Sequence, residues 1–264
     1  MHALIDTHAH LDEIENLRLA IERAREAGVV CIVAVGVDYE SNNRVLEISA
    51  QYSPLALAAL GCHPGNLPEA PSEIERNLQF IQDNNESAVG IGEIGLDYHK
   101  RILAHAGKDV QKRVLGDVLG LARRYRKPAL VHSRYAWRDA FELVQESGVE
   151  RTVFHWYTGP LKVLRDIVAR GHFCSATLAT EYHAEHRRVV KEVPLEMLML
   201  ETDCPVVYRS GSGAVHPSEP ADVAKVLQAV ALLREDDPSS VAERTADNAF
   251  RFFGIGEQAE KATC

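Results

Sequence analysis

The sequence lacks the features that mark membrane proteins, disulfide-bonded folds and zinc knuckles. No apolar run approaches the ~18–20 residues that span a bilayer. Residues 1–8 lack the basic start and the apolar core of a signal peptide. The five cysteines are odd in number and widely spaced, and no Cys-x-x-Cys pair occurs. We therefore expect a cytoplasmic protein with reduced thiols and no membrane association.

The composition is that of a globular protein with an excess of acidic residues. Of the 264 residues, 46% are hydrophobic and 25% are charged, which excludes collagen-like, low-complexity and disordered classes. The formal net charge is −9. A net negative protein repels polyanions, so a nucleic-acid substrate would have to be held by local positive charge.

Short apolar runs alternate with longer amphipathic stretches along the whole chain. Runs that are apolar throughout are typical of strands buried on both faces, as in a parallel sheet. Eight runs are predicted as strands: Ala3–Ile5, Val29–Val35, Leu55–Leu60, Ala88–Ile91, Ala129–Val131, Thr152–Phe154, His172–Ser175 and Met197–Leu200. The chain length matches the roughly 250 residues of a (β/α)₈ TIM barrel.

A doubly wound open sheet is the competing architecture. Its Gly-rich phosphate-binding turn is missing, because Gly90-Ile91-Gly92-Glu93-Ile94-Gly95 lacks the required spacing and does not open a helix. No break in composition suggests a second domain. We therefore predict a single α/β domain over residues 1–264, a (β/α)₈ TIM barrel.

Histidines and acidic residues fall at the carboxyl ends of five of the predicted strands. They are His8 and His10 after the first, Glu93 after the fourth, His132 after the fifth, His155 after the sixth and Asp203 after the eighth. In a (β/α)₈ barrel, these ends meet at the rim where active sites are built. Imidazole and carboxylate ligands suit zinc, manganese, iron or magnesium. Any one of these residues could instead be a hydrogen-bonded buried polar group, but their coincidence at one rim favours a metal centre.

Other residues near the predicted rim are candidates for substrate binding. His63 closes the third run, and Arg134 and Arg209 lie beyond strand ends where they could bind phosphate. Bases could stack on aromatic residues that follow site residues, or these aromatics could simply pack under loops. The aromatics are Tyr98, Tyr135, Trp156 and Tyr157.

Several further polar residues are predicted to have structural roles. Cys62 and Cys204 adjoin site residues but would point the opposite way, so we expect them to pack as thiols. The basic run Arg123–Lys127 ends a helix and faces the opposite end of the barrel. The remaining histidines considered are expected to be surface or packing residues: His2, His105, His172, His183, His186 and His216.

Six ordered motifs resemble the TatD-type metal-dependent hydrolases, amidohydrolase-like barrels that include deoxyribonucleases. They are residues 5–12 (Ile-Asp-Thr-His-Ala-His-Leu-Asp), 61–64 (Gly-Cys-His-Pro), 92–98 (Gly-Glu-Ile-Gly-Leu-Asp-Tyr), 131–134 (Val-His-Ser-Arg), 155–159 (His-Trp-Tyr-Thr-Gly) and 200–205 (Leu-Glu-Thr-Asp-Cys-Pro). The resemblance extends over nearly the whole chain and finishes with Asn248-Ala249 and Phe252-Phe253.

The resemblance implies a site with one or two divalent metal ions, whether Zn, Mn or Mg. Glu93 would bridge the two ions. His8, His10 and Asp203 would complete the coordination of one ion, and His132 and His155 would complete that of the other. Asp203 would also act as general base, which makes Asp203 and Glu93 the expected catalytic residues. His63 and Arg134 would contact the substrate.

Three departures from the family pattern alter substrate-facing loops. The second histidine that often follows the motif at residues 61–64 is replaced by Gly65-Asn66. The usual Cys-Phe after the histidine of the sixth strand is replaced by Trp156-Tyr157, and the usual Asn-Glu-Pro by Ser218-Glu219-Pro220. None of them removes a predicted metal ligand.

The leading functional prediction is a deoxyribonuclease of the 3′–5′ exonuclease type. In such an enzyme, metal-activated water cleaves the phosphodiester bonds of a nucleic acid, and DNA is the expected substrate. The alternative is an amide, ester or aminoacyl hydrolase that acts on a small molecule or a charged tRNA with the same metal centre. A non-catalytic metal-binding scaffold is disfavoured because all six ligands and the base are present. The native metal and the oligomeric state stay open.

Overall fold

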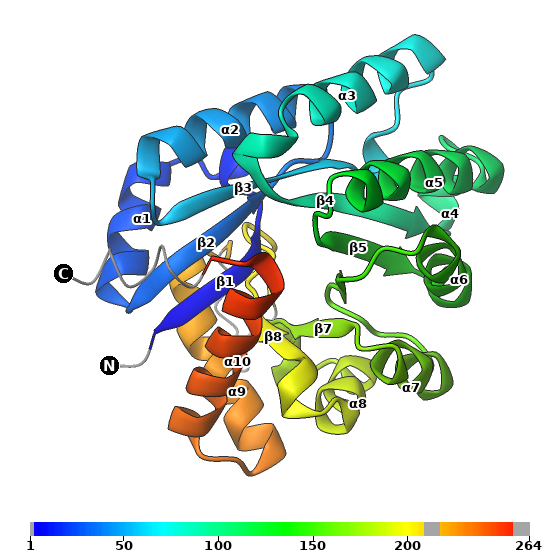
Figure 1. Ribbon diagram of the computed structural model, residues 1–264. Helices are drawn as coiled ribbons and strands as arrows, with labels where there is room; N and C mark the ends of the chain where they lie inside the picture. The colour runs from blue at the N-terminus through cyan, green and yellow to red at the C-terminus, as the bar shows by residue number, and fades with distance from the viewer. Residues whose placement is uncertain (1–2, 209–216, 256–264) are drawn as a thin grey trace.

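The computed structural model describes residues 3–208 and 217–255. Eight parallel strands follow one another in sequence order around one sheet (Figure 1). They are β1 (Leu4–Ala9), β2 (Val29–Val35), β3 (Ala56–Cys62), β4 (Ala88–Asp97), β5 (Ala129–Arg134), β6 (Thr152–Phe154), β7 (Phe173–Ala176) and β8 (Leu198–Leu200). The predicted (β/α)₈ barrel is confirmed.

Helices surround the sheet. They are α1 (Leu17–Glu26), α2 (Tyr39–Tyr52), α3 (Pro71–Asp83), α4 (Lys100–Leu103), α5 (Lys108–Arg124), α6 (Trp137–Ser147), α7 (Leu161–Ala169), α8 (Ala184–Glu192), α9 (Val223–Arg234) and α10 (Pro238–Phe253). Short 3₁₀ helices cover Leu11–Glu13, Pro64–Asn66, Asn85–Ser87, Leu178–Glu181, Leu195–Met197 and Pro220–Asp222. Among the described residues, none of the helices is long and apolar enough to cross a bilayer.

The fourth strand is longer than predicted. It was expected to end near Glu93, but β4 continues to Asp97 because its last residues pair with β5. Gly95 pairs with His132, and Asp97 pairs with Arg134. Glu93 therefore lies within a strand that is held on both sides, rather than at a free strand end.

The barrel closes between β8 and β1 through individual hydrogen bonds around one bridge. Ala9 and Cys204 form that bridge. The His10 backbone N–H donates to the Cys204 carbonyl oxygen at 2.8 Å, and the Asp203 N–H donates to the His8 carbonyl oxygen at 2.9 Å. The first and last strands are thus joined where the predicted ligands lie.

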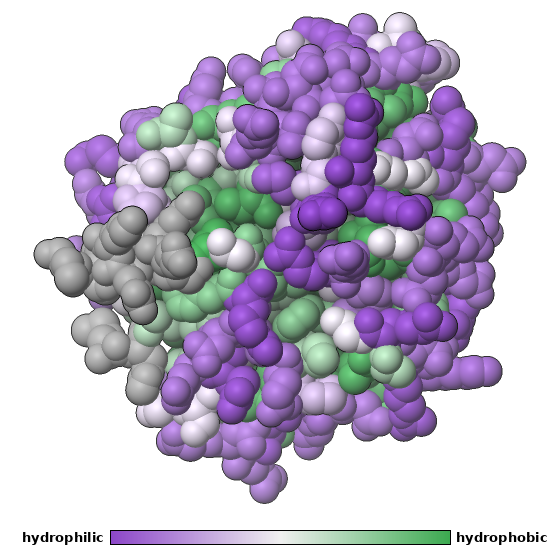
Figure 2. Space-filling view, viewed as in Figure 1, coloured by the Kyte–Doolittle hydropathy of each residue, from purple (hydrophilic) through white to green (hydrophobic). Residues whose placement is uncertain are grey.

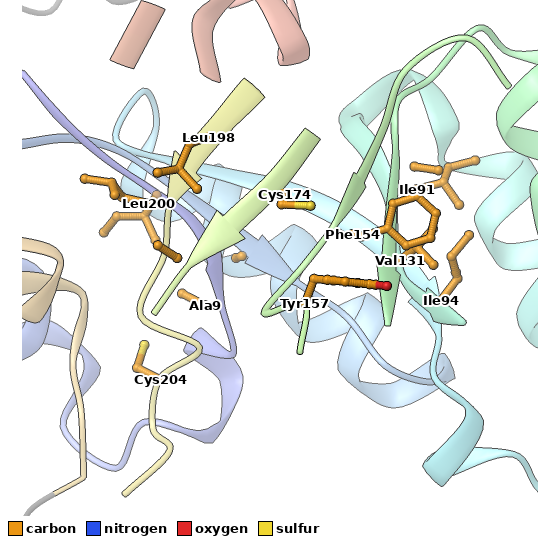
Figure 3. Packing of buried hydrophobic residues seen from close by; sticks show 14 of the residues in the cluster. Ala9, Ile91, Ile94, Val131, Phe154, Tyr157, Cys174, Leu198, Leu200 and Cys204 are labelled. Atoms are coloured by element: carbon orange, nitrogen blue, oxygen red, sulfur yellow. The ribbon is translucent and has the colours of Figure 1, made fainter. Parts of the chain in front are cut away.

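Two apolar layers stabilise the barrel. The larger layer fills the space between the sheet and the surrounding helices, and Figure 3 shows Phe154 of this layer beside Ile91, Ile94 and Val131. A second cluster lies inside the barrel, where Val33 and Met199 meet residues of α10 such as Phe252. Helix α10 therefore closes one end of the barrel and leaves the carboxyl ends of the strands for the site.

The distribution of side chains on the surface agrees with this layering. In the view of Figure 2, apolar residues gather toward the middle of the face, and hydrophilic residues dominate the outer helices. Cys62 and Cys204 are buried in the larger apolar layer, which confirms the expectation that they pack.

Candidate metal centre

The first group of predicted ligands comes from both sides of the barrel seam. His8 lies in β1 and His10 follows it, so the two imidazoles point the same way along the strand. The Nε2 atoms of His8 and His10 lie 3.5 and 3.3 Å from Oδ1 of Asp203. The three side chains therefore meet at one point although 193 residues separate His10 from Asp203 in the chain.

The second group comes from β5 and the end of β6. Nδ1 of His132 and Nε2 of His155 lie 3.3 Å apart. They lie 2.9 and 2.8 Å from Oε1 of Glu93. His132 thus faces the centre through Nδ1 and His155 through Nε2.

Glu93 joins the two groups. Its Oε1 faces His132 and His155, while its Oε2 lies 3.4 Å from Nε2 of His8 and 3.5 Å from Nε2 of His10. The backbone of Glu93 rests against Gly61, where an added Cβ would lie only 2.3 Å from both the nitrogen and the oxygen of Glu93. Glycine at position 61 is therefore required for this placement of the carboxylate.

The spacing and the donor set fit divalent ions. Atoms that bind one tetrahedral ion at about 2.0–2.1 Å lie about 3.3 Å from each other. The separations of 2.8–3.5 Å within each group match that value. Within the described part of the chain, both ring nitrogens of the fully buried His8 lack a hydrogen-bond partner. Because buried polar atoms are normally paired, this fits an imidazole that binds a metal ion. This donor set accepts several divalent metals.

The two carboxylates at the centre are held in their ionised forms. Burial by itself would raise the pKa of Glu93, but the surrounding histidines outweigh it, with His155 and His132 hydrogen-bonded to the carboxylate, and hold this pKa well below its ordinary value. The pKa of Asp203 is also lowered, because its hydrogen bond with His10 and the nearby histidine charges outweigh its burial. Both carboxylates are thus ready to bind cations.

Two further carboxylates, which the sequence analysis did not single out as site residues, support the second group from outside. Oδ2 of Asp97 lies 3.5 Å from Nε2 of His132, and Oε1 of Glu201 lies 3.4 Å from Nδ1 of His155. Carboxylates at the outer nitrogen fix the tautomer and orientation of a ligating imidazole. Even spacing was the available signal: Asp97 is four residues after Glu93, and Glu201 is two residues before Asp203.

Arg134 is less free than the sequence suggested. Its Nε donates to Oδ1 of Asp97 at 3.1 Å and its Nη2 to Oδ2 at 2.9 Å, so one edge of the guanidinium is occupied by this carboxylate. A phosphate would therefore have to contact the side of the guanidinium that Asp97 leaves open, and substrate binding by Arg134 stays a prediction. Arg134 still lines the cavity, and its contacts with Asp97 involve only Nε and Nη2.

His63 presents a neutral N–H to the centre. Its Nδ1 accepts a hydrogen bond from the Gly65 backbone N–H at 3.1 Å, so the proton of the neutral ring is on Nε2. That Nε2 lies 3.5 Å from Oε1 of Glu93. Burial lowers the pKa of His63 to about 4, which keeps the ring neutral at physiological pH.

A cavity of about 750 Å³ opens above the centre. The predicted residues on its wall are His10, His63, Glu93, His132, Arg134, Tyr135, His155, Trp156 and Asp203. His183, expected to be a surface or packing residue, also lines the cavity because it lies directly before α8 at the rim. Trp137, which was not predicted as a site residue, lines it as well.

Two of the aromatic residues considered for base stacking make other contacts. Tyr157 is fully buried, and the Tyr98 hydroxyl donates to Asp139. Arg209, His2 and His216 lie outside the described residues.

The remaining predictions of structural roles agree with the contacts. His186 is buried and bonds to backbone groups of Thr177 and Tyr157, and His172 lies against Gln145. Nζ of Lys127 bonds to the carbonyl of Ala88 at the start of β4, so the basic run lies at the opposite end of the barrel from the cavity.

The chain matches proteins of known family along almost its full length. A family model described as TatD related DNase matches residues 5–254. The "uncharacterized metal-dependent hydrolase YabD" of Bacillus subtilis is 33% identical over 96% of this chain and 99% of its own. Human "deoxyribonuclease TATDN3" is 30% identical over 95% and 94%.

Two further comparisons extend these similarities. The "3′-5′ ssDNA/RNA exonuclease TatD" of Erwinia tasmaniensis is 28% identical over 89% of this chain and 92% of its own. Among solved structures, the TatD homologue YjjV of Escherichia coli superposes with a TM-score of 0.87 at 28% identity, over 96% and 98% of the two chains.

Proposed function

On the premise that the chain belongs to the TatD-related DNase family and is a metal-dependent hydrolase, we propose that it cleaves phosphodiester bonds of DNA and removes nucleotides from the 3′ end of a single strand. The observation that carries the proposal is the two-sided placement of Glu93. Each of its oxygens faces a separate set of nitrogen or oxygen donors at the spacing of metal ligands.

The proposed ligands divide between two ions. His8, His10, Asp203 and Oε2 of Glu93 would hold one ion, and His132, His155 and Oε1 of Glu93 would hold the other. Divalent ions held there would lower the pKa of a bound water molecule. Their positive charge would offset the negative charge of the phosphodiester in the transition state.

The protein's own groups would then orient the substrate and move its protons. Asp203 is proposed as the general base, because its carboxylate is ionised and lies at the cavity wall. The Nε2–H of His63 would donate a hydrogen bond to a phosphoryl oxygen, since its Nδ1 is already an acceptor for Gly65. Arg134 would contribute one N–H from the side that Asp97 leaves open.

The charge around the cavity favours an end of a strand over a long duplex. In the described part of the wall, Arg134 is the cationic side chain, whereas Glu13 and Glu185 add negative charge. A substrate that follows a long polyanionic track needs many cations along it. We therefore propose that binding depends on one phosphodiester held at the centre, as at a 3′ terminus.

The test is hydrolysis of single-stranded DNA labelled at its 5′ end by enzyme loaded with Mg²⁺, Mn²⁺ or Zn²⁺. We expect a ladder that shortens from the 3′ end, loss of this activity in Asp203→Asn, and normal activity in the control Asp117→Asn, which changes an exposed carboxylate on α5. Intact DNA at high enzyme, together with Asp203-dependent cleavage of acyl esters or amides, would favour the acyl hydrolase instead.

A further inference from the structure

Two aromatic residues on the cavity wall have left-handed backbone conformations. Tyr135 has φ 58° and Trp156 has φ 40°. Bulky residues rarely adopt such angles, and they do so at a cost in free energy. Among the other non-glycine residues with positive φ in the described segments, Arg126 and Glu235 follow helix ends, and Asp203 belongs to the proposed centre.

These conformations bring neighbouring side chains to the same cavity. Arg134 and Tyr135 are neighbours in the chain, as are His155 and Trp156, and all four line the cavity. The left-handed residue shortly after each strand therefore carries its aromatic ring on the cavity wall beside a residue of the site. Packing alone does not account for this at Tyr135, because the residue is 59% exposed.

Other rings hold both aromatic side chains in place. Tyr135 lies edge-on to Trp137, with centroids 5.8 Å apart, and stacks beside His99 at 6.2 Å. The ring of Trp137 fits because residue 159 is glycine, where an added Cβ would lie 2.5 Å from Cγ of Trp137. Trp156 lies 5.6 Å from Tyr208. Both rings are therefore held by neighbouring rings and lie on the cavity wall beside His155 and Arg134.

We propose that Tyr135 and Trp156 bind the unpaired base of the terminal nucleotide by stacking and so determine a preference for single strands. This inference rests on the proposed function, because it places the phosphate of that nucleotide at the metal centre. Every base presents a π-face, so stacking selects for a free base rather than for a sequence. A cavity of about 750 Å³ is large enough for a nucleotide, and in a duplex the terminal base is paired and unavailable. Trp156 is also a position at which the chain departs from the family pattern.

The first experiment measures binding rather than turnover. Thymidine 5′-monophosphate and 2-deoxyribose 5-phosphate are titrated into Mn²⁺-loaded enzyme by calorimetry. Stacking strengthens binding by about 5- to 150-fold per base, so we expect the nucleotide to bind at least about fivefold more tightly than the sugar phosphate. Equal dissociation constants in the unaltered enzyme would overturn the inference, whether or not any variant folds.

The variants Tyr135→Asn and Trp156→Asn remove the rings but keep a residue that tolerates left-handed backbone. We expect each to bring the ratio of the two dissociation constants toward one, while the amount of bound metal stays unchanged. Trp156→Phe retains a ring and should restore most of the ratio. Tyr125→Asn, at the far end of α5, is the control and should leave the ratio as it is.

A kinetic experiment separates this inference from the proposed function. A single strand with an abasic 3′ nucleotide is compared with the normal strand, and kcat/KM should fall at least about fivefold. Equal kcat/KM values would overturn base stacking and leave the nuclease assignment standing. Preference for the nucleotide in binding without any DNA cleavage would support stacking and contradict the nuclease assignment.

Discussion

The carboxyl group of Asp6, whose pKa burial raises to about 8, is hydrogen-bonded to both the backbone N–H and the hydroxyl of Thr202, at 2.9 and 2.6 Å. The pair is buried and crosses the seam between β1 and β8. Asp6 is two residues before His8, and Thr202 directly precedes Asp203. The two halves of the first ligand group are therefore aligned by a contact that itself faces away from substrate.

We expect Asp6→Asn to weaken both folding and ion binding. An amide nitrogen in place of the carboxyl oxygen that faces the Thr202 hydroxyl changes this buried hydrogen bond, at a cost of about 1 kcal/mol in the free energy of unfolding. Ion affinity should fall about 10- to 100-fold, as for other supporting contacts of metal sites. Denaturant titration and competition with a chelator measure the two effects. An unchanged ion affinity would show that the seam does not position the ligands.

Asp97→Asn should act on the second group of ligands. The change removes the charge that faces Nε2 of His132 and loosens the pairing with Arg134. We expect about 10- to 100-fold weaker binding of one ion per chain, with the other little affected. Metal analysis after graded dialysis measures this. Asp109→Asn, near the start of α5, is the control, and equal loss of both ions in Asp97→Asn would contradict the division into two groups.

Gly61→Ala should displace Glu93, because the new Cβ would lie 2.3 Å from two backbone atoms of that residue. We expect lower stability and lower ion occupancy together, measured by thermal unfolding and metal analysis. Gly120→Ala is the matched control, since nothing lies within 4 Å of its Cβ position on α5. It should stabilise the protein by about 0.5–1 kcal/mol. Normal ion occupancy in Gly61→Ala would show that Glu93 is placed by other contacts.

Acid should destabilise the protein partly through His186. Burial lowers the pKa of this histidine from 6.5 to about 4. Between these two values the unfolded chain binds more protons than the folded one, so the free energy of unfolding falls as the pH drops from 6.5 to 4. The contribution is at most about 3 kcal/mol.

This prediction is checked by comparing urea unfolding of the unaltered protein and His186→Gln across that pH range. The difference between their free energies of unfolding should shrink toward low pH, because glutamine does not titrate. A difference independent of pH for His186→Gln would contradict the assignment.

The order of the barrel and the meeting of the six predicted ligands were accessible from sequence for definite physical reasons. Strands buried on both faces are apolar throughout, and parallel strands bring their carboxyl ends to one rim. His8, Glu93 and Asp203 stand out because charged or titratable residues rarely follow such runs by accident.

What could not be predicted depends on contacts between distant segments. The extension of β4 to Asp97 exists because β5 continues to Arg134 beside it. Trp137 is the first residue of α6, and the helical periodicity of the sequence does not indicate whether a first-turn side chain points toward the cavity. Its place on the cavity wall therefore could not be predicted. The left-handed angles of Tyr135 and Trp156 have no signature in their residue types, which are poorly suited to them.

The closure of the barrel has a consequence for how the protein matures. His8 and His10 leave the ribosome before their partner Asp203, which lies 193 positions after His10 in the chain. A growing chain thus carries an incomplete set of ligands until Asp203 has been synthesised. Uptake of a full set of cations can occur only once the last strand has docked, so cation content reports completed folding.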